Sequence, residues 1–235
     1  MPGISAPPYD EANLGPHVGD DPRAVAANRA ALEPVFGRIS WLTQAHGDEI
    51  VLADPSREPE ADGLIIAPGQ AGAVMVADCA PVLMAGGEGG NRLGAAVHAG
   101  RPGMMRGIAA KAARLLIAAG IDPATITCVI GPTVCGQCYE VPEDMAAEAD
   151  RRYPGCRVLT RWGTPGIDIR AGIVAQLAPL GVTITQVDAC TMEDDRFFSH
   201  RGSGGRTGRC AGVLAIPRHS EKVRARSNAS AIPSR

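Results

Sequence analysis

Short apolar runs, separated by polar and glycine-rich segments, make up most of the chain and predict many short β-strands. Two of the runs, 73–77 and 93–97, contain almost no polar side chain and predict buried strands on either side of a glycine-rich turn. Shorter apolar segments predict six further strands, at 39–44, 49–53, 64–66, 126–130, 182–187 and 210–216, and a weak strand within 157–170. Glycine and proline, at 29 and 19 residues, supply the turns between these strands.

Four helices are predicted between the strands, at 23–36, 104–119, about 142–152 and 171–180. The first follows Asp21-Pro22, a common helix start, and Gly37 is expected to end it. A tight turn at 101–103 is expected before the second helix, which has the clearest apolar face. Strands interleaved with helices in this way predict an α+β fold.

Three of the apolar runs lead into a side chain that can bind a metal, namely His46, Cys79 and His98. One thiolate and two imidazoles could form a three-ligand Zn²⁺ site with one open position, as in catalytic zinc sites. The spacing alone favours a buried free cysteine and two unrelated histidines, because it matches no local metal-binding pattern. The position of the three residues favours a site, because each follows a strand and precedes a turn of small residues. His17 and His219 are assigned to a loop and to the tail.

Two aspartates near these residues are candidates for acid–base or supporting roles. Asp62 belongs to an Asp-Gly pair and is by default a turn residue. Asp78 precedes Cys79, and the pleat of a strand would point its side chain to the opposite face. We therefore expect Asp78 to support Cys79 rather than to contact a substrate.

One local cysteine pair, Cys135-x-x-Cys138, is present. A redox pair of this kind normally opens a helix, whereas an extended segment is predicted to follow here. A four-cysteine zinc ribbon needs a second such pair, and the sequence contains none. Partly buried thiols near a turn are therefore the favoured interpretation.

The glycine-rich segment 202–209 has two interpretations. It lacks the Gly-Lys-Ser/Thr ending of a phosphate-binding P-loop, and a flexible surface loop accounts for it. Alternatively, its backbone N–H groups and Arg206 or Arg209 bind an anion. Arg101, three residues beyond His98, would then be a second contact for the same anion.

Composition and charge narrow the class of protein. With 23 basic and 25 acidic residues and 3% aromatic residues, the chain lacks the features of a nucleic-acid-binding protein. No apolar run of about 18 residues is present, so no membrane partner is expected. The first residues do not resemble a secretory signal, and the odd number of cysteines, seven, suggests reduced thiols; both predict a cytoplasmic protein. We expect a single domain, 1–217, followed by a disordered tail, 218–235.

Eight stretches of the chain together resemble one protein family. They are NLGPHVGDDPRAVAANRAAL, TQAHGDEIV, ADGLI, VADCAPVLM, AAVHAG, IGPTVCGQCYEV, CTMEDDRFFSHR and GRTGRCAGV, in the family's order over about residues 9–216. The family is the YfiH-like family, also called the laccase-domain or multicopper polyphenol oxidase family. Its members are now regarded as purine nucleoside phosphorylases.

This resemblance implies a fold, a metal and an activity. The implied fold is that of the YfiH and cytotoxic-necrotizing-factor group, a β-sandwich core flanked by helices. The implied ligands of Zn²⁺ are His46, Cys79 and His98, with copper as the alternative metal. The implied activity is phosphorolysis of adenosine, inosine or methylthioadenosine, with deamination of adenosine, so that a purine nucleoside and phosphate are the expected partners.

The resemblance also suggests residues for the rest of the reaction. Arg101 and Arg209 are candidates for binding phosphate, Asn13 for binding the substrate, and Asp62 or Glu140 for moving the proton. The family's usual His-Ala-Gly-Trp-Arg-Gly is replaced by His-Ala-Gly-Arg-Pro-Gly, so Arg101 stands one place earlier and the tryptophan is missing. The usual Cys-Cys-Tyr-Glu is Gln-Cys-Tyr-Glu here.

Other functions remain open at this point. Some bacterial relatives are described as peptidoglycan editing factors that act on UDP-muramyl amino-acid precursors, and such a hydrolase would use Cys79 as nucleophile and His98 as base. The polyphenol oxidase label implies copper, but five histidines are too few for a type 1 site and a trinuclear cluster. A partner-binding domain without catalysis is disfavoured, because candidate ligands and arginines cluster at strand ends.

Overall fold

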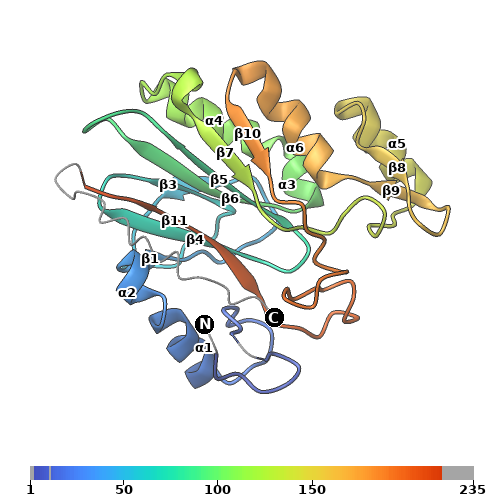
Figure 1. Cartoon of the computed structure of the whole chain (residues 1–235), viewed down its shortest axis with the longest axis horizontal. Helices are drawn as coiled ribbons and strands as arrows, with labels where there is room; N and C mark the ends of the chain where they lie inside the picture. Colours follow the sequence, from blue (N-terminus) through green and yellow to red (C-terminus); the bar gives the residue numbers. More distant parts are fainter. Residues whose placement is uncertain (1–2, 11, 219–235) are drawn as a thin grey trace, which may run out of the picture.

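Two β-sheets lie face to face in the computed structural model, and helices cover the outer side of each sheet (Figure 1). The structure describes residues 3–10 and 12–218, so the predicted tail lies outside the described residues except for Arg218. The predicted α+β fold with a β-sandwich core is confirmed. Within the described residues, no helix has both the length and the apolar character needed to span a membrane.

The larger sheet has six strands. In their order across the sheet they are β10 (Thr183–Gln186), β7 (Thr127–Ile130), β5 (Ala80–Gly86), β6 (Leu93–Ala99), β3 (Gly63–Ile66) and β2 (Ile50–Leu52). The four central strands are antiparallel, and each edge strand runs parallel to its neighbour. Successive side chains of β5 point to opposite faces of the sheet, and both faces are apolar. Val82 and Met84 pack against the helices, while Leu83 and Ala85 pack against the other sheet.

The smaller sheet consists of three strands, β1 (Ile39–Ser40), β4 (Gln70–Val76) and β11 (Cys210–Ile216). On β4, Val74 packs between the two sheets, whereas Ala73 and Met75 belong to the core on the outer side. Gly72 lies where the sheets approach each other closely, because an added Cβ would stand 2.8 Å from the Leu64 side chain. The close packing of the sheets thus requires glycine at this position.

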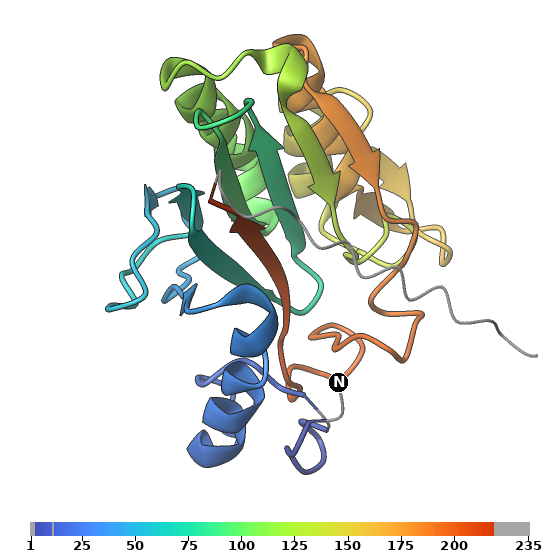
Figure 2. The same cartoon turned by 60° about the vertical axis from the view of Figure 1, so that its left-hand side comes forward.

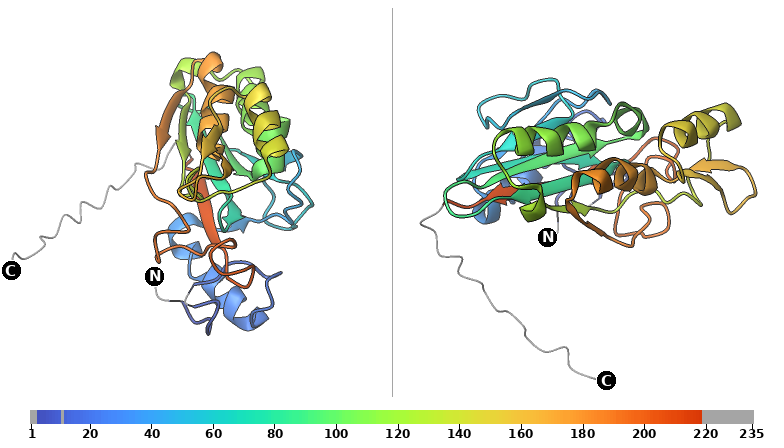
Figure 3. Two further views of the ribbon diagram at one scale, coloured as in Figure 1. Left: turned by 90° about the vertical axis from the view of Figure 1, so that its right-hand side faces the viewer. Right: turned by 90° about the horizontal axis from the view of Figure 1, so that it is seen from above.

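Within the described residues, six α-helices complete the layers. They are α1 (Pro22–Ala30), α2 (Glu33–Phe36), α3 (Arg101–Arg106), α4 (Ile108–Ala118), α5 (Glu143–Arg152) and α6 (Ile169–Leu177). Seen in Figure 2, α1 and α2 lie on the opposite side of the sheets from α4 and α6. Helix α5 packs with a small hairpin of β8 (Arg157–Leu159) and β9 (Pro165–Ile167) at one end of the molecule (Figure 3).

Two predicted helices are each divided in the structure. The helix expected at 23–36 ends at Ala30 and restarts as α2, because Pro34 has no N–H to donate and its ring would clash with the Ala30 carbonyl. The helix expected at 104–119 is interrupted by Gly107, which has a φ of +80°. Its first part begins at Arg101, so the predicted tight turn at 101–103 is the first turn of α3.

A strand that the apolar pattern did not reveal, β5, lies in the middle of the larger sheet. The chain is apolar almost without interruption from β4 through β5, and only Ala77, Asp78 and Cys79 separate the two strands. Asp78 makes the turn with a φ of +85°. This short connection carries the chain from the smaller sheet to the larger one.

Replacing Leu64 by alanine should show how much the packing between the sheets stabilises the fold. Leu64 is 1% exposed and lies in the core between the sheets, so we expect the free energy of unfolding to fall by roughly 2–5 kcal/mol. The matched control is Leu52→Ala on β2, where the side chain is 71% exposed and the change should stay within about 0.5 kcal/mol. Urea denaturation of both variants measures the difference, and equal losses would contradict this account of the core.

Candidate active site

The turn between β4 and β5 places Cys79 where the chain passes from one sheet to the other. The neighbouring Asp78 is 8% exposed, and its carboxylate accepts hydrogen bonds from Thr191 Oγ1 and Ser199 Oγ, both at 2.7 Å. The backbone N–H of Arg201 donates to the same carboxylate at 2.6 Å. Asp78 therefore supports the turn that presents Cys79, as the sequence predicted, although it does so from a turn rather than from a pleated strand.

His46 lies in the loop between β1 and β2 and has a φ of +58°. Its strained backbone is held by one carboxylate, because Asp62 accepts hydrogen bonds from the N–H groups of Ala45, His46 and Gly47 at 2.6–3.3 Å. Residues other than glycine in this conformation are uncommon and concentrate at functional sites. Asp62 thus fixes the loop that carries His46.

The same carboxylate orients His98 at the end of β6. His98 is 2% exposed, and its Nδ1 lies 2.7 Å from Asp62 Oδ1. Because Nδ1 is bonded to the carboxylate, Nε2 is left to face the space beside Cys79 and His46. Asp62 is therefore a positioning residue for both histidines and is not placed to exchange protons with a substrate.

The three candidate ligands meet in one cluster. One donor atom from each of His46, Cys79 and His98 lies within 4.8 Å of the others, and the Cys79 Sγ is 3.7 Å from His46 Nε2. Gly100 makes room for them, since an added Cβ would stand 2.9 Å from the Cys79 Sγ. The sequence placed all three residues at strand ends, and the fold brings them together.

Hydrogen bonding sets the protonation of this cluster. Burial by itself would raise the pKa of Cys79, but hydrogen bonds from His46 and His98 lower it to about 6. Burial would lower the pKa of His98, but the hydrogen bonds to Asp62 and Cys79 raise it to about 9. Elsewhere, burial raises the pKa of Cys128 to about 12. These hydrogen bonds favour the thiolate form of Cys79, the form in which cysteine binds metals, and a protonated His98, which must release its proton when a metal binds.

The donor set fits zinc. Tetrahedral Zn²⁺ with Zn–S of about 2.3 Å and Zn–N of about 2.0 Å places sulfur and nitrogen about 3.6 Å apart. The separation of 3.7 Å between Cys79 and His46 agrees with this value. The pairing of Asp62 with His98 is the carboxylate–histidine arrangement that orients zinc-bound imidazoles. Three protein ligands would leave the fourth coordination position of the zinc ion open to water or a substrate.

A cavity of about 280 Å³ opens beside the cluster. Besides the three candidate ligands, its lining includes Arg101, Arg201, Arg209, Tyr139, His17 and His200. The guanidinium of Arg201 lies 5.2 Å from the ring centre of Tyr139. The volume is at the small end of the range for ligand cavities, and the three arginines suit an anion.

Several predicted residues lie elsewhere. Asn13 is fully buried outside this lining, and its Oδ1 accepts a hydrogen bond from the backbone N–H of Arg209 at 2.8 Å. It therefore positions Arg209 and is not placed to bind a substrate. The side chain of Glu140 is exposed and outside the lining, and only its backbone carbonyl is used, by Arg201 at 3.0 Å. Arg206 is exposed and also outside the lining.

Four residues of the cavity were not singled out from the sequence for this site. His17 was assigned to a loop, yet it lines the cavity, and burial together with Arg209 and Arg29 lowers its pKa. All four residues stand in stretches that carried the family resemblance, NLGPHVGDD for His17, CYEV for Tyr139 and FFSHR for His200 and Arg201, which was the available signal.

A comparison with protein families is consistent with this fold and site. Residues 1–217 match the family described as multi-copper polyphenol oxidoreductase laccase. The chain belongs to this family. Solved structures of similar proteins are the YlmD protein of Geobacillus stearothermophilus, with a TM-score of 0.84 and 29% identity over 93% of this chain and 89% of that one, and NMB0706 of Neisseria meningitidis, with a TM-score of 0.82 and 29% identity over 92% and 91%.

Relatives within this laccase-like family carry another name. A Mycobacterium tuberculosis protein named purine nucleoside phosphorylase is 48% identical over 90% of this chain and 87% of its own length. A Streptomyces coelicolor protein of the same name is 44% identical over 90% of both chains. The chain is therefore similar over nearly its whole length to proteins named for an enzymatic activity.

Proposed function

We propose that this protein is a zinc-dependent purine nucleoside phosphorylase. The observation that carries the proposal is a single cavity in which the cluster of His46, Cys79 and His98 faces Arg101 and Arg209. Phosphorolysis needs a site for an anion beside a site for a nucleoside, and this cavity offers both. The names of the relatives in Mycobacterium and Streptomyces support the same activity.

The residues of the cavity account for the binding of both substrates. The guanidinium groups of Arg101, Arg201 and Arg209 carry the positive charge that holds phosphate. The ring of Tyr139 offers the purine an aromatic face. In the reaction, a phosphate oxygen forms a bond to C1′ of the ribose while the bond from C1′ to N9 of the purine breaks. The electron pair of the broken bond passes to the purine, which must then take up a proton.

Proton transfer is assigned to the histidines that line the cavity. Asp62 is occupied by His98 and three backbone N–H groups, and Glu140 lies outside the lining. His17 and His200 line the cavity, and imidazole is the side chain most often used as a general acid or base. These two histidines therefore replace the carboxylates as candidates for protonating the leaving purine.

His46, Cys79 and His98 would hold the zinc ion, which would supply a Lewis acid and would lower the pKa of a bound water molecule. This chemistry supports a second activity of the same site, deamination of adenosine, in which water adds at C6 and ammonia leaves. Asp62 holds the two histidines in place for it, and the cavity histidines move the protons. Copper is the alternative metal for this donor set.

The proposal is tested by supplying inosine or adenosine with and without phosphate. We expect free base and ribose 1-phosphate to form only when phosphate is present, and about one zinc per chain at the site of Cys79. Release of ammonia from adenosine without phosphate would report the deaminase activity separately. If no nucleoside is converted by the zinc-loaded protein, the proposal fails.

Replacing Arg101 by glutamine is expected to weaken phosphate binding. A hydrogen bond to a charged group contributes about 1.5–3 kcal/mol, so the KM for phosphate should rise roughly tenfold to a hundredfold. The KM for the nucleoside should change little. The matched control is Arg114→Gln on the exposed side of α4, which removes the same charge away from the cavity. An unchanged KM for phosphate in Arg101→Gln would remove this arginine from the anion site.

A cysteine hydrolase acting on cell-wall precursors is the second candidate function. The lowered pKa of Cys79 and the pairing of His98 with Asp62 also suit a cysteine nucleophile with an oriented base. Such a mechanism needs one histidine, whereas two face the thiol here, which favours metal binding. Activity that survives chelation and is lost on alkylation of Cys79 would favour the hydrolase. Polyphenol oxidation by several coppers stays disfavoured, because the chain has only five histidines.

A further inference from the structure

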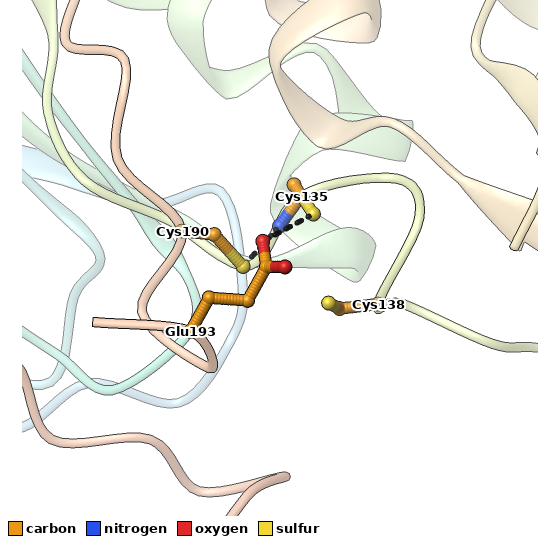
Figure 4. Close-up of side chains that lie close together, drawn as sticks. All are labelled: Cys135, Cys138, Cys190 and Glu193. Atoms are coloured by element: carbon orange, nitrogen blue, oxygen red, sulfur yellow. Dashed lines mark hydrogen bonds between the residues drawn. The ribbon is translucent and has the colours of Figure 1, made fainter. Parts of the chain in front are cut away.

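A second cluster of potential metal ligands lies outside the cavity, on the loops that follow β7 and β10 (Figure 4). It contains Cys135, Cys138, Cys190 and Glu193, and one donor atom from each lies within 4.8 Å of the others. In Figure 4 the side chains of Cys190 and Glu193 point toward the thiol of Cys135, with Cys138 beside them. The proposed phosphorylase reaction uses none of these residues.

The cluster is built from two turns of the same form. In the turn Cys135-Gly-Gln-Cys138, the N–H groups of Cys138 and Tyr139 donate to the Cys135 carbonyl at 2.9 and 3.0 Å. In the turn Cys190-Thr-Met-Glu193, the N–H groups of Glu193 and Asp194 donate to the Cys190 carbonyl, both at 3.1 Å. Each turn therefore brings its first and fourth side chains to one side, as in the paired Cys-x-x-Cys turns of structural zinc sites.

The two turns are joined directly. The backbone N–H of Cys135 donates to the Cys190 Sγ at 3.3 Å, and the N–H of Thr191 donates to the Thr133 carbonyl, also at 3.3 Å. The sequence suggested no partner for Cys135-x-x-Cys138, because it contains no second pair of cysteines with this spacing. The structure supplies Cys190-x-x-Glu193, in which a carboxylate stands in the place of the fourth thiol.

Distances and charges suit a tetrahedral zinc ion. With Zn–S of about 2.3 Å and Zn–O of about 2.0–2.2 Å, sulfur and oxygen ligands lie about 3.6 Å apart, and Cys135 Sγ is 3.6 Å from Glu193 Oε2. Three thiolates and one carboxylate would leave Zn²⁺ with an excess negative charge. Arg161 offsets part of that charge, since its Nη2 lies 2.8 Å from the Cys138 Sγ and pairs with Glu193.

We propose that Cys135, Cys138, Cys190 and Glu193 form a second, structural zinc site. The site is accessible to an incoming ion, because Cys135, Cys190 and Glu193 line a wide surface groove while Cys138 is 2% exposed beneath them.

This second site would act on the first through Asp78. Val134, next to Cys135, donates its N–H to the Asp78 carbonyl at 3.0 Å, and Thr191, next to Cys190, donates its hydroxyl to the Asp78 carboxylate at 2.7 Å. A zinc ion that clamps the two turns together would therefore hold in place both loops that grip Asp78. Asp78 in turn presents Cys79 at the other site.

The test is a titration of the metal-free Cys79→Ala protein with Co²⁺. This substitution removes the thiolate of the first site, so any absorption from thiolate-to-cobalt charge transfer must come from the second. We expect one Co²⁺ per chain with the intense absorption of several thiolates, displaced by one equivalent of Zn²⁺. Adding Cys135→Ser should abolish the high-affinity site, and adding Glu193→Gln should weaken Co²⁺ binding, because an anionic ligand is replaced by a neutral one.

Matched variants keep this test decisive. Glu193 has an exposed side chain, so Glu193→Gln is expected to fold even where a cysteine variant does not. Cys210→Ser, a half-buried cysteine outside the cluster, should leave the titration unchanged. Absence of thiolate–cobalt absorption in Cys79→Ala, or a disulfide within the cluster that persists after treatment with a reducing agent under anaerobic conditions, would overturn the proposal. The readout does not depend on nucleoside turnover, so it separates this proposal from the proposed activity.

Discussion

Replacing Cys79 by alanine is expected to abolish phosphorolysis and to remove the metal from the cavity, while the protein stays folded. The substitution deletes the one thiolate among the three candidate ligands and leaves two histidines, too few to hold zinc firmly. A catalytic metal contributes several kcal/mol of charge stabilisation. A loss of about 4 kcal/mol corresponds to roughly a thousandfold lower kcat/KM. Mass spectrometry of the metal content and an assay with inosine and phosphate measure both effects.

The control for this variant is Cys128→Ala, which removes a thiol that is fully buried in β7 and outside both clusters. It should keep the metal and the activity and lose only some stability. Circular dichroism of both variants shows whether they are folded. Full activity in folded Cys79→Ala would exclude this residue from the site, whichever metal the protein carries.

Replacing Asp62 by asparagine should weaken metal binding without removing a ligand. The carboxylate is 1% exposed and bonds both the His98 ring and the three N–H groups of the loop that carries His46. Loss of a residue that hydrogen-bonds a metal ligand typically lowers metal affinity or activity by about 10–100-fold. The zinc concentration that gives half-maximal activity should rise by that factor, and saturating zinc should restore much of kcat.

A purely structural role for Asp62 would give another result. In that case Asp62→Asn would lower the melting temperature, and added zinc would not restore kcat in the fraction that remains folded. The matched control is Asp195→Asn, the same change at an exposed position outside the cavity lining, which should affect neither quantity. Recovery with zinc thus distinguishes positioning of the ligands from general stability.

The hydrophobic pattern predicted most of the strands and helices. It failed where two strands are separated by too few polar residues to mark the boundary between them. The last strand, β11, has the predicted bounds, 210–216, because Arg209 and Pro217 mark both ends. Strand β5 was missed, because the turn before it is made by Asp78 in a conformation that usually signals glycine. Tertiary context, rather than local sequence, holds that turn through Thr191 and Ser199.

The candidate site was predictable as far as its ligands are concerned. His46, Cys79 and His98 all precede small residues at the ends of apolar runs, and the fold places them together. The roles of Asn13 and Glu140 could not be found in this way, because burial and the direction of a side chain depend on packing between distant segments. His17 was set aside for the same reason, since nothing in its own loop shows that the loop lies across the cavity.

The passage of the chain from one sheet to the other at Asp78 and Cys79 has a consequence for folding. The candidate zinc ligands come from three separated segments, and they can meet only after the two sheets have packed together. A chain with mispaired sheets presents isolated thiols and imidazoles, which bind zinc weakly. Zinc bound as proposed would therefore favour the correctly assembled molecule, and at a free concentration a hundred times the dissociation constant it would stabilise that molecule by about 2.7 kcal/mol. The proposed metal would thus stabilise the packed arrangement of the two sheets in addition to its role in the reaction.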